Sequence, residues 1–115
     1  MSQAIFGNIE QLLKNMAADD PPKNVISGSP TTLYGELLSQ DGLDVGVWRC
    51  TVGTWEITNY SINEVMLMLS GKMRLTDSSG HSKDLAKGDL FFIPKGWRGT
   101  WEVVEEMEKV YVIMS

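Results

Sequence analysis

From residue 31 onward, short runs rich in Val, Ile, Thr, Trp and Tyr alternate with turn-forming Gly, Asp, Ser and Asn. The runs recur about every eight to twelve residues, a spacing typical of an antiparallel sandwich or barrel. We expect strands near 32–38, 43–51, 53–58, 63–70, 72–77, 81–85, 89–93, 98–104 and 108–114. In this division Ser70-Gly71 separates two strands, and the acidic run 105–108 is a solvated turn. A chain of 115 residues suffices for one hydrophobic core, so we expect one all-β domain over residues 31–115.

We expect the first 30 residues to form a separate N-terminal helix and linker arm. Apolar residues at helical spacing predict an amphipathic helix over residues 3–17, which the run Asp19-Asp20-Pro21-Pro22 ends. Residues 18–30 are expected to lie over the surface as a linker. The helix either caps an open end of the core or docks a partner.

Charge and composition exclude several classes of protein. Ten Lys and Arg against fifteen Asp and Glu give a net charge of −5, which argues against nucleic-acid binding because phosphates require a basic surface. The chain has no run of about eighteen apolar residues that would span a membrane. Its start lacks a signal peptide's basic and apolar regions, and its single cysteine, Cys50, has no disulfide partner. We therefore expect a cytoplasmic protein that binds neither nucleic acid nor membranes.

Two strand runs, 65–69 and 90–93, are apolar at successive positions. A strand with one exposed face would alternate, so both faces of these strands are expected to be covered. The barrel interior covers one face. The N-terminal helix or a second subunit covers the other, and we predict a homodimer.

Two spaced motifs are similar to the paired motifs of the cupin superfamily. They are Gly53-x5-Asn59-x-Ser61-x2-Glu64-x6-Gly71 and Gly88-Asp89-x4-Pro94-x-Gly96-x2-Gly99, and the resemblance covers residues 44–114. The run 88–103 more narrowly resembles the cupins grouped with (S)-ureidoglycine aminohydrolase, to which a domain of ethanolamine-utilisation protein Q is related. The resemblance implies a small antiparallel cupin barrel, or double-stranded β-helix jelly roll, preceded here by a short helix.

The resemblance also identifies the positions at which other cupins hold a metal. Metal-bearing members place two histidines and a glutamate in the first motif and one histidine in the second. Those positions here are Asn59, Ser61, Glu64 and Gly99, of which only Glu64 suits a transition metal. The sole histidine, His81, falls in an expected hairpin loop, so we predict no metal and no cofactor.

Side-chain alternation predicts what fills the interior instead. If position 99 faces inward, Trp101 faces inward as well, and Glu64 shares an inward row with Met66. We expect the Trp101 indole N–H to donate to Glu64. Trp97 either packs in the core or lies at the rim of the barrel mouth beside Arg98. The expected small-molecule site comprises Asn59, Ser61, Glu64, Met66, Trp97, Arg98, Gly99 and Trp101.

These residues leave three functions open. The first is a metal-free cupin that binds an unidentified small molecule, with no assigned reaction. The second, implied by the resemblance, is an enzyme acting on a small nitrogen-containing metabolite, with Glu64 as acid/base. The third is an accessory protein of a metabolic assembly, docked through the N-terminal helix. A buried Glu64 must be protonated, hydrogen-bonded or charge-paired in any of them.

Overall fold

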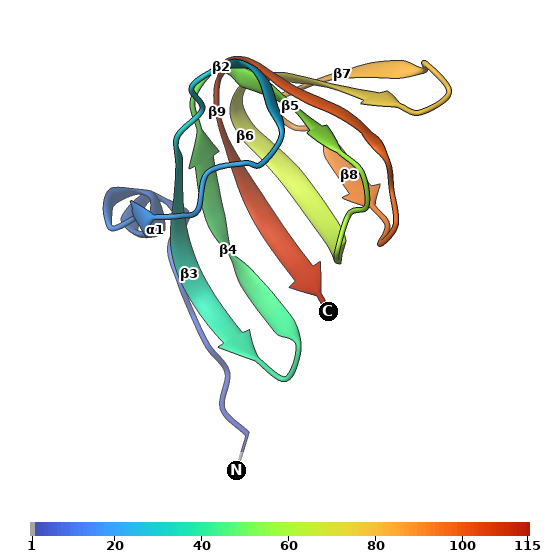
Figure 1. The fold of residues 1–115 in the computed structure, drawn as a ribbon. Helices are drawn as coiled ribbons and strands as arrows, with labels where there is room; N and C mark the ends of the chain where they lie inside the picture. The colour runs from blue at the N-terminus through green and yellow to red at the C-terminus, as the bar shows by residue number, and fades with distance from the viewer. Residues whose placement is uncertain (1) are drawn as a thin grey trace.

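The computed structural model describes residues 2–115 and consists almost entirely of antiparallel strands that form one curled sheet (Figure 1). Strands β1, β3, β4, β9, β5 and β2 are neighbours in that order, and β6 pairs with β7, β8 and β9. The predicted all-β fold with a short N-terminal helix is confirmed. The elements are α1 (Ile9–Lys14), β1 (Ala17–Ala18), β2 (Val25–Gly28), β3 (Thr32–Gln40), β4 (Leu43–Cys50), β5 (Gly53–Ile57), β6 (Asn63–Asp77), β7 (Ser82–Ala86), β8 (Leu90–Ile93) and β9 (Gly99–Met114).

The long strand β9 organises the sheet. Its first part pairs with β5, its second part pairs with β4, and β6 pairs along its other edge. The buried side chains of β9 all face the concave side of the sheet, and they are Trp101, Val103, Met107, Lys109 and Tyr111. The same strand therefore supplies both the hydrophobic core and, further along, a polar region.

Strands β6 and β9 are each continuous where the sequence predicted a break. Gly71 has φ +78° and lies where the register between β6 and β9 shifts. The acidic run 105–108 is part of β9: Met107 is fully buried, and Glu105 pairs with Lys72 at 3.2 Å. The predicted break and the predicted turn are wrong for one reason, because a β-bulge changes the alternation of side chains without ending the strand.

The N-terminal arm has a shorter helix and more strand pairing than predicted. Helix α1 covers Ile9–Lys14 rather than residues 3–17, and the Asn8 side chain caps it by accepting from the backbone N–H of Gln11. Strands β1 and β2, within the expected linker region, pair with β3 and β5. Helix α1 packs on the outer face of β3 and β4 rather than on an open end of the core. No helix within residues 2–115 has the length and apolarity needed to cross a membrane.

The outer face of β6 and β8 has no cover within residues 2–115. Leu90 and Phe92 are 71% and 53% exposed, beside the half-buried Val65 and Leu67 on β6. The expectation that both faces are covered is therefore not met by the N-terminal helix, which lies on β3 and β4. Exposed apolar patches are often interaction surfaces, and the homodimer stays a prediction that this face makes testable.

Charge placed on this face tests the predicted homodimer. We expect wild-type protein to sediment as a dimer at micromolar concentration and the Leu90→Lys/Phe92→Lys variant as a monomer, because two ammonium groups cannot be desolvated in an apolar interface. Val52→Lys is the control, since Val52 is 54% exposed and lies in the loop between β4 and β5. A wild-type monomer in sedimentation equilibrium would contradict the prediction.

Two glycines test the bulge in β6. Gly71 and Gly80 both have positive φ, but a Cβ at Gly80 meets nothing within 4 Å, whereas one at Gly71 lies 2.5 Å from the Cα of Met107. We expect Gly80→Ala to lower the free energy of unfolding by about 1 kcal/mol, the cost of its backbone conformation. Gly71→Ala should cost at least about 2 kcal/mol more, because backbone atoms must move. Urea denaturation measures both values, and equal losses would be inconsistent with a sterically required glycine.

Candidate functional site

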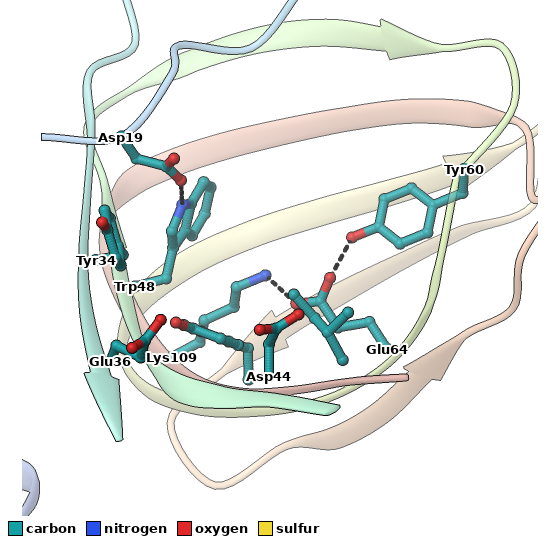
Figure 2. Close-up of a pocket in the computed structure, with 10 residues that line it drawn as sticks. Asp19, Tyr34, Glu36, Asp44, Trp48, Tyr60, Glu64 and Lys109 are labelled. Carbon is teal, nitrogen blue, oxygen red and sulfur yellow. Dashed lines mark hydrogen bonds and ion pairs between the residues drawn. The ribbon is translucent and has the colours of Figure 1, made fainter. Parts of the chain in front are cut away.

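A pocket of about 360 Å³ opens on the concave side of the sheet (Figure 2). Strands β3, β4, β6 and β9 supply most of its walls, and the segments before β3 and β6 supply the rest. Four carboxylates, three phenols, an indole and one ammonium group make the pocket both polar and aromatic. Its lining residues are Asp19, Tyr34, Glu36, Asp44, Trp48, Tyr60, Glu64, Lys109, Tyr111 and Ile113.

A buried ion pair forms the base of the pocket. Lys109 Nζ donates to Glu64 Oε2 at 2.8 Å, and the two residues are 4% and 3% exposed. The ammonium group also lies 4.5 Å and 4.9 Å from the ring centroids of Trp48 and Trp101 and 3.0 Å from Met66 Sδ. Pairing of β6 with β9 brings these two charges together across 45 residues of sequence. Because either charge alone would be costly to bury, the pair acts as a unit.

Tyr60 occupies the other oxygen of the carboxylate. Its hydroxyl donates to Glu64 Oε1 at 2.6 Å. Burial and the nearby charge of Glu64 raise the pKa of Tyr60, so the phenol stays protonated and remains a donor. The prediction that a buried Glu64 is hydrogen-bonded or charge-paired is confirmed, since both of its oxygens have partners.

Trp101 fills the interior as predicted but does not reach Glu64. It is 2% exposed and stacks on Trp55 and Tyr60, with ring centroids at 5.7 Å and 6.3 Å. Its Nε1 is buried without a hydrogen-bond partner in the part of the chain that the structure describes. The predicted bond from Trp101 to Glu64 is wrong, because Tyr60 and Lys109 already occupy the carboxylate.

The turn of the second motif fixes the backbone of Tyr60. Tyr60 N–H donates to the Trp97 carbonyl at 2.9 Å, and Gly96 N–H donates to the Tyr60 carbonyl at 2.7 Å. Gly96 has φ +91°, a conformation that glycine adopts without steric cost. This turn therefore positions the phenol that binds Glu64. The turn belongs to the second motif, which supplies a metal-binding histidine in other cupins.

The other residues of the sequence-predicted site lie around or below the pocket rather than in its lining. Asn59 and Ser61 are exposed in the loop between β5 and β6. Trp97 packs against the hydrophobic core, and Arg98 and Gly99 line a separate depression near β5. Met66 and Trp101 lie beneath the ion pair. Only the carboxylate at position 64 lines the pocket itself.

Lys109 was the largest omission from the sequence-based site. A signal for it was present, because a lysine between Met107 and Tyr111 lies on an inward row and needs a buried partner. The predicted turn at residues 105–108 interrupts the alternation of side chains, and the inward row is hidden for that reason. The wall residues of β3 and β4 gave no such signal, since they resemble ordinary exposed strand positions.

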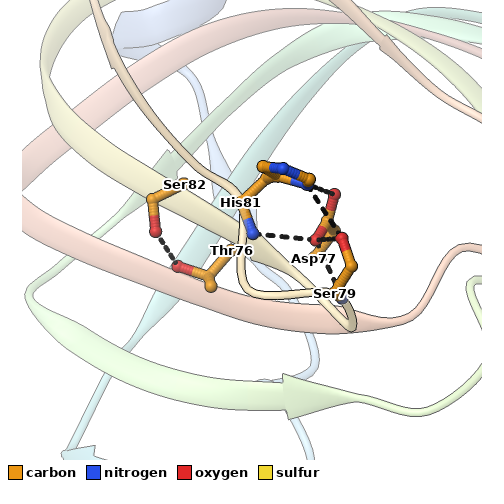
Figure 3. A network of polar contacts seen from close by, with 5 residues as sticks. All are labelled: Thr76, Asp77, Ser79, His81 and Ser82. Atoms are coloured by element: carbon orange, nitrogen blue, oxygen red, sulfur yellow. Dashed lines mark hydrogen bonds and ion pairs between the residues drawn. The ribbon is translucent and has the colours of Figure 1, made fainter.

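Two potentially reactive side chains lie away from the pocket. His81 is in the hairpin loop, as predicted, with its side chain 87% exposed. Figure 3 shows Asp77 accepting from the Ser79 hydroxyl and from the backbone N–H groups of His81 and Ser79; these bonds, the hydroxyl's first, lower the pKa of Asp77 and close the loop. Cys50 is fully buried, and burial raises the pKa of its thiol to about 12, so it stays protonated at neutral pH.

The side chains present do not fit the transition-metal site of metal-bearing cupins. Of the four positions that the motifs identify, only Glu64 offers a suitable donor within the pocket. Residues 2–115 contain no group of three or more His, Cys, Asp or Glu side chains arranged to hold an ion. The ammonium of Lys109, which has no lone pair to give a metal, is already bound to the carboxylate.

Comparisons with known proteins agree with this fold. Residues 38–111 match the EutQ-like cupin domain family, while no curated protein matches the sequence. A DUF861-family protein of unknown function from Pseudomonas syringae has a TM-score of 0.82 and 24% identity over 87% of this chain, which spans only 44% of that protein. EutQ of Clostridium difficile has a TM-score of 0.65 and 20% identity, covering 75% of this chain and 69% of its own.

A DUF861-family protein from Thermotoga maritima is 34% identical, with a TM-score of 0.55, covering 59% of this chain and 76% of that one. The structural matches under 25% identity establish the fold alone, whereas the family match includes more than half of the sequence. The motifs, the curled antiparallel sheet and the match over residues 38–111 together show that this chain belongs to the EutQ-like cupin family.

Proposed function

We propose that the protein binds a small molecule in the 360 Å³ pocket and does so without a metal ion. The observation that carries the proposal is the Glu64–Lys109 pair at the base of this pocket. In a metal-bearing cupin the glutamate of the first motif is neutralised by the ion it binds. Here the ammonium of Lys109 supplies that positive charge from within the chain, so the carboxylate needs no external cation.

The pocket above the pair has the size and chemistry of a ligand site. Small-molecule pockets have volumes of about 300–1,000 Å³ and combine aromatic surface with a few polar groups that fix orientation. Tyr34, Trp48 and Tyr111 give this one aromatic walls, and carboxylates on β3 and β4 add polar groups. The resulting site favours binding and orientation of a ligand over any particular reaction.

The alternatives from the sequence stay predictions. For Glu64 to act as an acid/base, as the resemblance to ureidoglycine aminohydrolase implies, a substrate would have to displace Tyr60 or Lys109. An accessory role in a metabolic assembly finds support in the exposed Ile5 and Phe6, which are 46% and 88% exposed just before α1. A cytoplasmic location is likewise expected from the sequence alone.

A double-mutant cycle tests the ion pair that stands in for the metal. Lys109→Met leaves the Glu64 carboxylate buried without its cation, and we expect a loss of about 3–5 kcal/mol in the free energy of unfolding. Glu64→Gln/Lys109→Met should recover most of this loss, because no unpaired charge remains. Urea denaturation measures each variant.

The exposed pair Lys72–Glu105 provides the matched control. Its side chains are 64% and 59% exposed, so Lys72→Met should cost less than about 1 kcal/mol. If the losses for Glu64→Gln and Lys109→Met simply add in the double variant, the two groups are not coupled and the pair does not have the role proposed.

A space-filling substitution tests the pocket as the ligand site. In a thermal-shift panel of amines, carboxylates, ureides and sugars, we expect one class to raise the melting temperature of metal-depleted wild-type protein. Ile113→Trp fills the pocket and should lower the affinity for that class at least about tenfold. Val52→Trp, a comparable change in an exposed loop, should leave the affinity unaltered.

The panel is run with EDTA and again with added Mn²⁺ or Zn²⁺. Stabilisation that appears only with added metal would overturn the metal-free proposal. Binding that persists in Ile113→Trp would show that the ligand lies elsewhere.

A further inference from the structure

The wall of the pocket is strongly acidic. Four carboxylates and one ammonium group line it, which leaves a net charge of −3. Lys109 is committed to Glu64, so Asp19, Glu36 and Asp44 remain. None of these three forms an ion pair with another of the residues 2–115. The negative charge of the pocket is therefore uncompensated above its base.

Two of these carboxylates are oriented but not neutralised. Trp48 Nε1 donates to Asp19 Oδ2 at 3.2 Å, and the Ser39 hydroxyl donates to Asp44 Oδ1. An indole and a hydroxyl carry no net charge, so these hydrogen bonds fix the direction of the carboxylates without changing the charge of the wall. Glu36, on β3, is exposed beside them.

The carboxylates surround a space that is too large for a bare ion. No three acidic, histidine or cysteine side chains within residues 2–115 converge closely enough to hold a metal. The volume they enclose, about 360 Å³, is that of an organic-ligand pocket. The charge of these carboxylates is therefore suited to an organic molecule rather than to a metal ion.

The Tyr111 phenol supplies an independent polar contact for a ligand of this pocket. Tyr111 is only 8% exposed and lines the pocket, and its hydroxyl takes part in none of the hydrogen bonds within residues 2–115. Its β4 partner is Gly46, where a Cβ would lie 2.6 Å from the Tyr111 hydroxyl. The ring is largely buried but the hydroxyl itself reaches the pocket surface, so it is available to a molecule in the pocket.

The negative charges of the pocket wall affect the pKa of the Tyr111 phenol. Burial first, and then the charges of Glu36, Asp44 and Asp19, raise the pKa of Tyr111 to about 12. The aromatic walls favour a positive ligand as well, because ring faces attract cations. Trp48 already demonstrates this preference, since the Lys109 ammonium lies 4.5 Å from its ring centroid.

We infer that the ligand of this pocket is a small organic cation, an ammonium group on an apolar body, bound between the carboxylates of Asp19, Glu36 and Asp44 and the aromatic walls. This inference rests on the proposed function, because it names the class of molecule that occupies the same pocket. An anionic ligand would face the net negative wall with no unpaired cation in its lining.

Matched probes of equal shape and different charge test the inference. They are benzylammonium, benzyl alcohol and benzoate, together with butylammonium, butanol and butyrate, each titrated by calorimetry. We expect at least one ammonium probe to bind tenfold or more tightly than its neutral and anionic counterparts. The affinity of this probe should fall as the NaCl concentration is raised, because salt screens the carboxylates of the pocket wall.

Charge-neutral variants identify the groups responsible. Asp19→Asn and Asp44→Asn should each weaken the ammonium probe at least threefold and leave the alcohol unchanged. Asp41→Asn is the control with the same change in net charge: Asp41 is exposed in the turn between β3 and β4, outside the pocket lining, and its φ of +53° suits Asn equally. Equal weakening by the control would mean that overall charge, rather than this pocket, attracts the probe, and would overturn the inference.

The remaining outcomes separate the two proposals. If a neutral or anionic molecule binds more tightly than its ammonium counterpart and Ile113→Trp abolishes that binding, the cation inference fails and the proposed function stands. If no probe and no member of the thermal-shift panel binds wild-type protein, both fail. Ammonium binding that Ile113→Trp leaves unchanged would also overturn the inference, because the cation would then lie outside the pocket.

Discussion

The ion pair between Glu64 and Lys109 is the interaction on which the site depends. It joins the two longest strands, and both of its side chains are almost fully buried. Each neighbour then has a defined role: Tyr60 satisfies the second carboxylate oxygen, and the aromatic rings of Trp48 and Trp101 lie near the ammonium. Removing one partner leaves a buried charge that the remaining hydrogen bonds cannot compensate.

The bulged strands explain how one sheet holds both a dry core and a polar pocket. Along β6 the inward side chains are Glu64, Met66 and Met68. The bulge at Gly71 then shifts the alternation by one residue, so that Met73 is the next inward side chain. The methionines fill the closed part of the curl, where flexible thioethers adapt to an irregular volume. The register between β6 and β9 therefore sets the depth at which charge begins.

The sequence predicted the inward rows wherever alternation was unbroken. It placed Glu64 on an inward row with Met66 and placed Trp101 inside, and the structure agrees. It did not yield Lys109, because a bulge has no composition of its own and a charged stretch within a strand resembles a turn. The pocket walls could not be predicted for a different reason. They come from strands that lie close together because the sheet is curved, and the spacing of residues along one strand does not predict that curvature.

In the proposed metal-free site, a lysine in place of a metal changes more than the identity of the cation. A metal ion exchanges with solvent and offers open coordination positions, whereas the ammonium of Lys109 is covalently attached and its contacts are with Glu64, Met66 and two indole rings. The base of the pocket is then close to neutral, and the carboxylates of the pocket wall set the charge that a proposed ligand would encounter. In the proposed site, selectivity can be altered by substitutions of Asp19, Glu36 and Asp44, none of which is a partner of the buried pair. Under the proposed function, the residues that stabilise the fold are thereby distinct from those that select the ligand.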